Sequence, residues 1–144
     1  MAERPSGSPA ISGILETVLY VDDLAAARDF YRGVLGLSET VEDARMLAYD
    51  VARRGMLLLF ERGSSSETIT IPGGTIPPHD GRGPAHAAFA IPADALAEWE
   101  RHLASHRVAI EGRVTWPRGG RSIYFRDPSG NLLELATPGL WPGY

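Results

Sequence analysis

Residues 121–135 have the sequence RSIYFRDPSGNLLEL, and this pattern predicts two strands joined by a tight turn. The central Asp-Pro-Ser-Gly at 127–130 is typical of a type I turn. Because side chains alternate along a strand, Leu133 and Leu135 face one way and Glu134 faces the other, among apolar neighbours. A buried carboxylate is costly unless it is paired or coordinates a metal. The alternative is an edge strand with Glu134 in water.

Composition narrows the class of protein. The 144 residues are enough for one domain or for two small modules that share a core. The net charge of -4 and scattered arginines give no footprint for nucleic acid. No apolar run is long enough for a membrane helix and no signal pattern opens the chain, so we expect a cytoplasmic protein without membrane contact. The chain has no Cys and no Lys, which excludes disulfides, a thiol nucleophile and Schiff-base chemistry.

The chain divides by its local patterns. Two segments each have the order strand, helix and three strands, and the linker between them is rich in Gly, Ser and Pro. The expected parts are a flexible tail over 1–13, module one over 14–61, a connector over 62–83, module two over 84–137 and a C-terminal tail over 138–144. Residues 14–137 then form a single domain.

The two modules form a weak internal repeat. Glu16 and His86 hold matching places on the opening strand of each module, 70 residues apart. A curved four-stranded sheet cannot bury both of its faces alone, so we expect the modules to pair around a cavity. The predicted fold is α+β, with paired βαβββ modules forming a barrel-like, cup-shaped mixed sheet. We expect a homodimer, and the sequence leaves open whether the modules pair within one chain or across it.

Two motifs carry a resemblance to a known family. The helix ending with Phe30-Tyr31 and Leu35-Gly36-Leu37, together with the hairpin 124–135, resembles the vicinal oxygen chelate superfamily. That superfamily includes glyoxalase I, bleomycin-resistance proteins, extradiol dioxygenases and fosfomycin-modifying enzymes. The resemblance implies a divalent metal held by three residues, one from the first strand of each module and one from the last strand of the second. The matching residues here are Glu16, His86 and Glu134.

The residues themselves agree with such a site. Each of the three is the only ionisable group on the inward face of its predicted strand. Two carboxylates and an imidazole suit Mn, Fe, Co, Ni, Zn or Mg, and spacing does not choose among them. The alternatives are a water-facing Glu16 and a His86 bonded to a carbonyl in the core. The dioxygenases use two His and one carboxylate, so Glu16 makes that activity the less expected one.

The leading function is therefore a glyoxalase-like enzyme, a lyase, isomerase or ring-opening catalyst acting on a small oxygenated or electrophilic molecule. Glyoxalase I also uses a Glu near the end of module one. Aligning residues 55–60 with residues 130–135 puts Leu59 at the position of that Glu. Glu61 shares the face of Leu59 and is the nearest candidate for a proton-transfer role. Tyr124 is a candidate proton donor beside Glu134, or an ordinary aromatic of the barrel.

Further residues are candidates for contact with the substrate. Arg118 and Arg121 flank a flexible turn and suit a carboxylate or phosphonate, although solvated loop arginines are commoner. Ser122 shares the strand face of Tyr124, and Trp116 adds an aromatic surface. The alternative function is a non-catalytic, bleomycin-resistance-type protein that sequesters a drug and confers antibiotic resistance.

Overall fold

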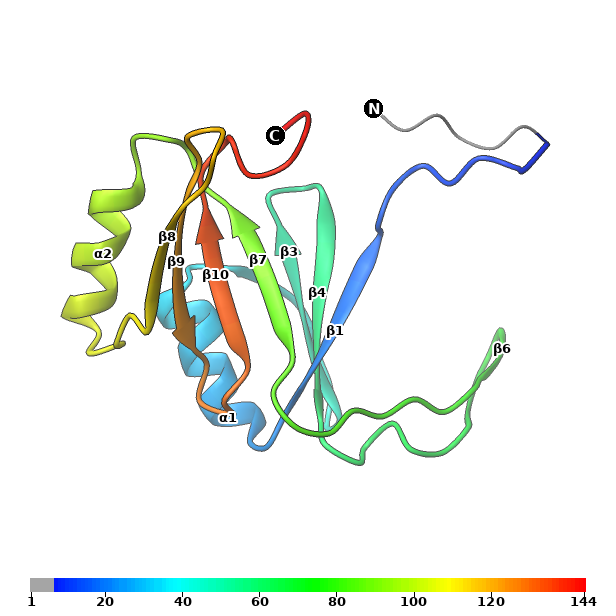
Figure 1. Cartoon of the computed structure of the whole chain (residues 1–144). Helices are drawn as coiled ribbons and strands as arrows, with labels where there is room; N and C mark the ends of the chain where they lie inside the picture. Colours follow the sequence, from blue (N-terminus) through cyan, green and yellow to red (C-terminus); the bar gives the residue numbers. More distant parts are fainter. Residues whose placement is uncertain (1–6) are drawn as a thin grey trace.

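The computed structural model describes residues 7–144, so part of the predicted N-terminal tail, residues 1–6, lies outside the described residues. Module one, connector and module two follow one another along the chain (Figure 1). Module one contains β1 (Glu16–Val21), α1 (Leu24–Arg28), η1 (Asp29–Val34), β2 (Ser38–Glu42), β3 (Met46–Val51) and β4 (Gly55–Glu61). The connector contains β5 (Ile69–Ile71) and β6 (Gly74–Ile76). Module two contains β7 (His86–Ala90), α2 (Leu96–Ser105), β8 (Gly112–Thr115), β9 (Arg121–Arg126) and β10 (Leu132–Ala136).

The two modules have the same topology. Their sheets have the strand orders β1-β4-β3-β2 and β7-β10-β9-β8. In each sheet the first and last strands of the module pair in parallel, and the remaining pairs are antiparallel. The predicted α+β fold of paired βαβββ modules is confirmed. The sheets form an open cup rather than a closed barrel (Figure 1).

The first helix differs from the regular helix that its spacing predicts. Asp23 caps it as expected, because its carboxylate accepts hydrogen bonds from the backbone N–H groups of Ala25 and Ala26 at 2.8 and 3.1 Å. After Arg28 the chain continues as the π-helix η1. The wider turn lets the adjacent Phe30 and Tyr31 both enter the core. Tertiary burial of this aromatic pair outweighs the local preference for an α-helix.

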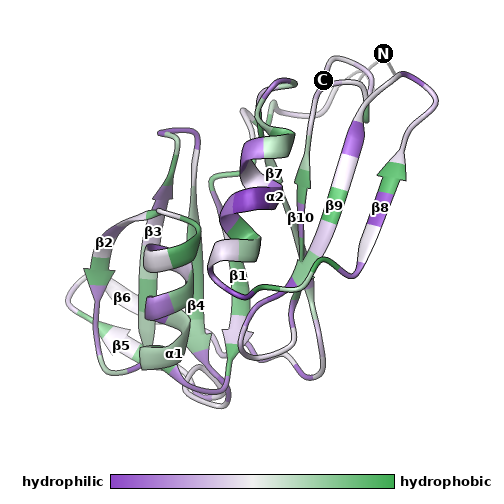
Figure 2. Cartoon of the chain, turned by 90° about the vertical axis from the view of Figure 1, so that its left-hand side faces the viewer, coloured by the Kyte–Doolittle hydropathy of each residue, from purple (hydrophilic) through white to green (hydrophobic). Residues whose placement is uncertain are grey.

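The modules share one hydrophobic core on the side of the sheets that carries the helices. Both α1 and α2 lie in front of the sheets in Figure 2, and the opposite faces carry no helix. The rings of Phe30 and Phe125 meet across the two modules with centroids 6.3 Å apart. A buried hydrogen bond of 2.7 Å from the Tyr31 hydroxyl to Asp127 joins them again. Pairing of the modules on the helix side therefore occurs within one chain.

The hairpin of β9 and β10 agrees with its prediction. The N–H of Gly130 donates to the carbonyl of Asp127 at 3.1 Å, and Glu134 lies opposite Tyr124. Strand β10 is central, between β7 and β9, and Glu134 is buried. The alternative of an edge strand with this carboxylate in water is therefore wrong. No helix in the described range is long and apolar enough to cross a membrane.

Candidate functional site

The helix-free face of module two gathers several of the predicted site residues. Strand alternation places Glu134 on this face, with Ala88 beside it on β7 and Tyr124 beside it on β9. His86 opens β7 and lies directly opposite Leu132, two residues before Glu134. The register that the turn imposes on the hairpin thus brings a histidine, a tyrosine and a carboxylate to neighbouring strands.

His86 and Glu134 form a close pair. Nδ1 of His86 lies 2.9 Å from the carbonyl oxygen of Leu132, and because a carbonyl only accepts, this nitrogen donates. The other ring nitrogen, Nε2, lies 3.3 Å from Oε2 of Glu134. The Glu134 side chain is only 6% exposed, whereas that of His86 is 47% exposed. The imidazole therefore separates a buried carboxylate from solvent.

The arrangement fits a bound cation. Nε2 of His86 and Oε2 of Glu134 face each other at 3.3 Å, a contact that either a proton on Nε2 or a metal ion bound by both atoms would make favourable. The second carboxylate oxygen, Oε1, is buried and has no hydrogen-bond partner among the described residues. A buried charged oxygen without a partner is costly, and ligation of a metal satisfies both oxygens. His86 and Glu134 are thus suited to hold a divalent metal.

Tyr124 lies beside this pair. Its ring stacks on that of His86 with centroids 6.2 Å apart and an interplanar angle of 26°. Burial and the neighbouring charge of Glu134 raise the pKa of Tyr124 above its ordinary value of 10.0. The phenol therefore keeps its proton at neutral pH and can donate it.

Glu16 does not join the pair. No cluster of three or more His, Asp or Glu that could hold a metal occurs within residues 7–144. Glu16 opens β1, where it lines a cavity of about 450 Å³ on module one. It also lines a groove of about 310 Å³ that has His86 on its other wall. The convergence of all three predicted ligands is therefore not found within the described part of one chain.

The register of β4 corrects the alignment of the two modules. Leu58 lies opposite Val18, two residues after Glu16, just as Glu134 lies opposite Ala88, two residues after His86. The counterpart of Glu134 in module one is therefore Leu58, not Leu59. Leu59 is fully buried in the helix-side core. Glu61 lies on that same side of β4, away from the helix-free face that bears Glu16.

The predicted substrate-binding residues fall into two groups. The indole N–H of Trp116 donates to the Ser122 hydroxyl at 2.8 Å, and Ser122 is buried on the strand face of Tyr124. Arg121 is exposed and alternates with Ser122, so it lies on the opposite face of β9. Arg118 lies in the turn between β8 and β9. The structure thus brings Trp116 and Ser122 near Tyr124 but does not bring the two arginines there.

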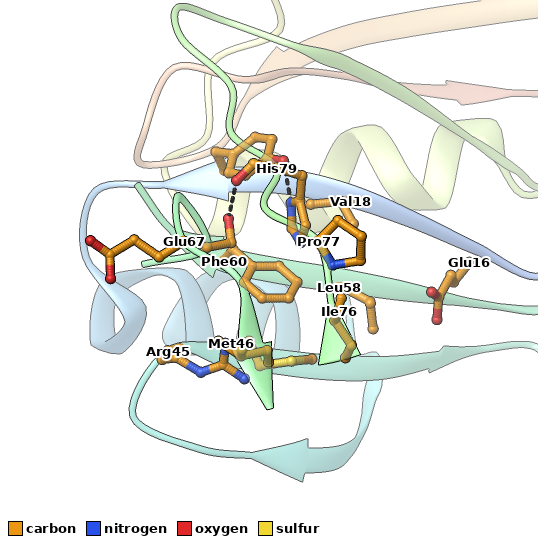
Figure 3. A pocket seen from close by; sticks show the side chains of 13 residues that line it. Glu16, Val18, Arg45, Met46, Leu58, Phe60, Glu67, Ile76, Pro77 and His79 are labelled. Carbon is orange, nitrogen blue, oxygen red and sulfur yellow. Dashed lines mark hydrogen bonds between the residues drawn. The ribbon is translucent and has the colours of Figure 1, made fainter. Parts of the chain in front are cut away.

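Two residues that the sequence analysis did not single out define the cavity on module one. The Tyr20 hydroxyl and Nδ1 of His79 are hydrogen-bonded at 2.6 Å, although the residues are 59 positions apart, and His79 lies beside Phe60 and Pro77 in Figure 3. The ring of His79 also contacts that of Phe60 edge-on at 4.8 Å. The only sequence signal was the place of Tyr20 on the same strand face as Glu16.

The fold of paired βαβββ modules agrees with that of one known superfamily. A family model described as the Glyoxalase/Bleomycin resistance protein/Dioxygenase superfamily matches residues 13–135, and the chain belongs to that superfamily.

Particular relatives narrow the comparison. The chain is 30% identical over 131 residues to metallothiol transferase FosB from Staphylococcus haemolyticus, covering 90% of this chain and 86% of that protein. It is 31% identical over 128 residues to the FosB of Staphylococcus saprophyticus, covering 88% and 78%. The crystal structure of lactoylglutathione lyase from Agrobacterium tumefaciens superposes with a TM-score of 0.84 and 35% identity, covering 92% of this chain and 98% of that one. Its related proteins are therefore enzymes that act on small molecules.

Proposed function

We propose that this protein is a divalent-metal-dependent enzyme that acts on a small oxygenated or electrophilic molecule. The observation that carries the proposal is the pair of His86 and Glu134, in which Nε2 and Oε2 face each other at 3.3 Å. A proton alone would leave Oε1 of Glu134 without a partner, whereas a metal ion satisfies both groups. One imidazole and one carboxylate are compatible with Mn, Fe, Co, Ni, Zn or Mg.

A homodimer supplies the third ligand in this proposal. His86 and Glu134 give two protein ligands, and catalytic sites of this kind commonly use three. Glu16 is exposed at the start of β1, and none of the salt bridges among the described residues includes it. We therefore assign Glu16 of a second copy to the centre formed by His86 and Glu134, and the reciprocal site forms by symmetry.

The chain's own residues then have distinct tasks. A divalent metal bound there would act as a Lewis acid toward neighbouring substrate oxygens. Glu134 is held by its central strand, and His86 is oriented by its hydrogen bond to the Leu132 carbonyl. Tyr124 holds a proton beside the carboxylate and donates it to the substrate. Trp116 fixes the buried Ser122 behind Tyr124 through its indole N–H.

The names of two relatives support a particular class of reaction. A metallothiol transferase and a lactoylglutathione lyase are both similar to this chain, and both names refer to thiol compounds. We propose transfer or elimination of a thiol at an electrophilic carbon as the chemistry to test first. An isomerase or ring-opening reaction requires the same metal and the same proton donor.

Sequestration of a drug without catalysis is the second candidate. Its support is the cavity of about 450 Å³ on module one, whose lining is mostly apolar and which lies apart from the His86–Glu134 pair. A sequestering protein needs this cavity and not the metal. Turnover of the bound molecule that stops when the metal is removed separates the enzyme from the sequestering protein.

Complementation between two inactive chains tests the shared centre. We would co-express differently tagged Glu16→Ala and His86→Ala/Glu134→Ala chains and purify the mixed dimer. The proposal predicts one metal per mixed dimer, because one of its two sites keeps all three ligands, and no tightly bound metal in either variant alone. A mixed dimer as metal-free as the two parents would refute the supply of Glu16 by the second copy, and full metal content in Glu16→Ala alone would remove Glu16 from the centre.

Turnover tests the reaction class. Purified protein loaded with Mn, Zn or Mg is incubated with a thiol and epoxides, or with 2-oxoaldehyde–thiol adducts alone, and the consumption or release of free thiol is followed. Tyr124→Phe should lower kcat by roughly 10²- to 10⁴-fold if the tyrosine is the proton donor. Glu61→Gln is the control, because Glu61 lies on the other face of its sheet, and it should leave the rate unchanged.

A further inference from the structure

We propose that the module-one cavity binds the apolar body of an uncharged or cationic small molecule, and that the connector forms the wall that selects it. The inference rests on the proposed function only in treating this body as part of the substrate. Binding in the cavity itself requires no metal.

The cavity lies between the sheet of module one and the connector. Its floor is the helix-free face of β1, β3 and β4, where Val18, Leu58 and Phe60 project (Figure 3). Its opposite wall comes from the connector, through Ile76 of β6 and the following Pro77. The volume of about 450 Å³ is in the range of sites for drug-sized molecules. An apolar ligand gains most by displacing water from such a lining.

The connector is anchored at its base. Ser65 is buried and donates to the carbonyl of His79 at 2.6 Å, and the N–H of His79 donates to the Ser65 carbonyl at 2.9 Å. The Tyr20 hydroxyl holds the ring of the same histidine. Gly81 packs on the Tyr20 ring so closely that an added Cβ would lie 2.4 Å from Cδ2. The wall is therefore preorganised before a ligand arrives.

A second clamp joins the connector to the end of β1. The Arg62 guanidinium donates to Asp22 at 2.7 Å and to the carbonyls of Gly81 and Gly83 at 3.4 Å. The β5–β6 hairpin projects beyond these clamps (Figure 1). In the described structure, module two contains no equivalent of this hairpin. The two modules therefore carry different features: module two has the His86–Glu134 pair, and module one has an apolar cavity.

The charges around the cavity select against anions. In the metal-free protein, two acidic residues, Glu16 and Glu67, line the cavity with one arginine, Arg45, whose guanidinium already has the Asp43 carboxylate 3.7 Å away. A phosphonate or carboxylate ligand would meet more negative than positive charge in a partly apolar space. A neutral molecule pays no such penalty, and a cation is attracted. The selected body is therefore apolar and not anionic.

A matched pair of fluorescent probes tests this inference on metal-free protein in EDTA. N-phenyl-1-naphthylamine is uncharged, and 8-anilino-1-naphthalenesulfonate has the same ring system with a sulfonate added. We expect the uncharged probe to bind with one site per chain and the sulfonate to bind at least tenfold more weakly. Equal affinity for both probes, or no binding of the uncharged probe, would overturn the proposal.

Two substitutions on the hairpin locate the site. Ile76→Ser removes an apolar side chain from the cavity wall and should weaken the uncharged probe about tenfold. Ile71→Ser is the matched control, because Ile71 is comparably exposed, on the paired strand, and does not line the cavity. Equal effects of the two changes would place the probe elsewhere and contradict the assignment. Because EDTA is present, failure of the probe to bind the cavity does not bear on the proposed metal site. Conversely, a protein that binds no metal but binds the probe would refute the metal site and support the cavity proposal.

Discussion

Replacing Glu134 by Gln should stabilise the metal-free protein. Oε1 of this buried carboxylate has no partner among the described residues, and Oε2 lies 3.3 Å from Nε2 of His86. A glutamine carries no charge to desolvate, and its amide N–H can donate to Nε2. An unsatisfied buried charged group costs about 1–3 kcal/mol or more, so removing it should raise the melting temperature by about 3–9 °C.

The same substitution should remove most of the stabilisation that metal confers. A metal present at 100 times its Kd adds about 2.7 kcal/mol, or about 8 °C. An uncharged amide is a weaker ligand than a carboxylate, and a hundredfold loss of affinity leaves about 0.4 kcal/mol, or about 1 °C. Metal should therefore raise the melting temperature of Glu134→Gln by only about 1 °C and that of the wild type by about 8 °C, so the advantage of the variant in EDTA should shrink by about 7 °C in metal.

Differential scanning calorimetry at pH 8, with EDTA or with Mn, Zn or Mg, measures both effects. Glu16→Gln is the control in EDTA, since Glu16 is exposed and its substitution should change the stability by less than about 0.5 kcal/mol. A Glu134→Gln variant that is less stable than the wild type in EDTA would refute the reasoning. It would mean that the carboxylate already has a favourable partner in the metal-free protein.

Three more predictions concern the scaffold that positions this pair. Tyr31→Phe removes the buried hydrogen bond to Asp127 and should lower the free energy of unfolding by about 1.5–3 kcal/mol in urea titrations. Tyr49→Phe loses a 3.3 Å hydrogen bond to Glu39 and should lower it by less. Equal losses in the two variants would contradict a special role for the hydrogen bond between the modules. Burial and the charge of Glu39 raise the pKa of Tyr49 to about 12, and burial and the charge of Asp127 raise that of Tyr31. Because the folded state favours the protonated phenols, the stability that they contribute is complete below pH 10 and is lost as the pH rises toward 12. Unfolding followed by circular dichroism should therefore show a loss of stability between pH 10 and 12, and this loss should be smaller in Tyr49→Phe. Asp23→Ala removes the cap of α1 and should cost about 1 kcal/mol by thermal unfolding, with Asp50→Ala, outside any helix, as the comparison.

Local patterns predicted most of the fold. The Asp-Pro-Ser-Gly turn fixed the register of the hairpin, and the register placed Glu134 beside Tyr124. The repeat of strand, helix and three strands predicted two modules, and the two sheets have matching strand orders. Pairing Leu59 with Glu134 was a slip of one residue, and on a strand one residue exchanges the two faces.

What local patterns missed depends on distant contacts. The π-helix η1 reflects the burial of Phe30 and Tyr31 against both modules. The cavity on module one depends on the contact of Tyr20 with His79 across 59 residues of chain. The position of Glu16 apart from His86 and Glu134 is set by how the two sheets splay, which no strand pattern encodes. The sequence predicted which residues share a strand face, but it did not predict how the helix-free faces of the two modules are placed relative to each other.

Metal titration of the metal-free wild type tests the central claim most directly. Isothermal titration calorimetry with Mn, Zn and Mg, confirmed by elemental analysis, should give one ion per chain for at least one of these metals. His86→Ala and Glu134→Ala should each abolish that binding while the variants remain folded by circular dichroism. Full occupancy in either variant, or no tight binding of any of these metals by the wild type, would contradict the assignment of His86 and Glu134 as metal ligands.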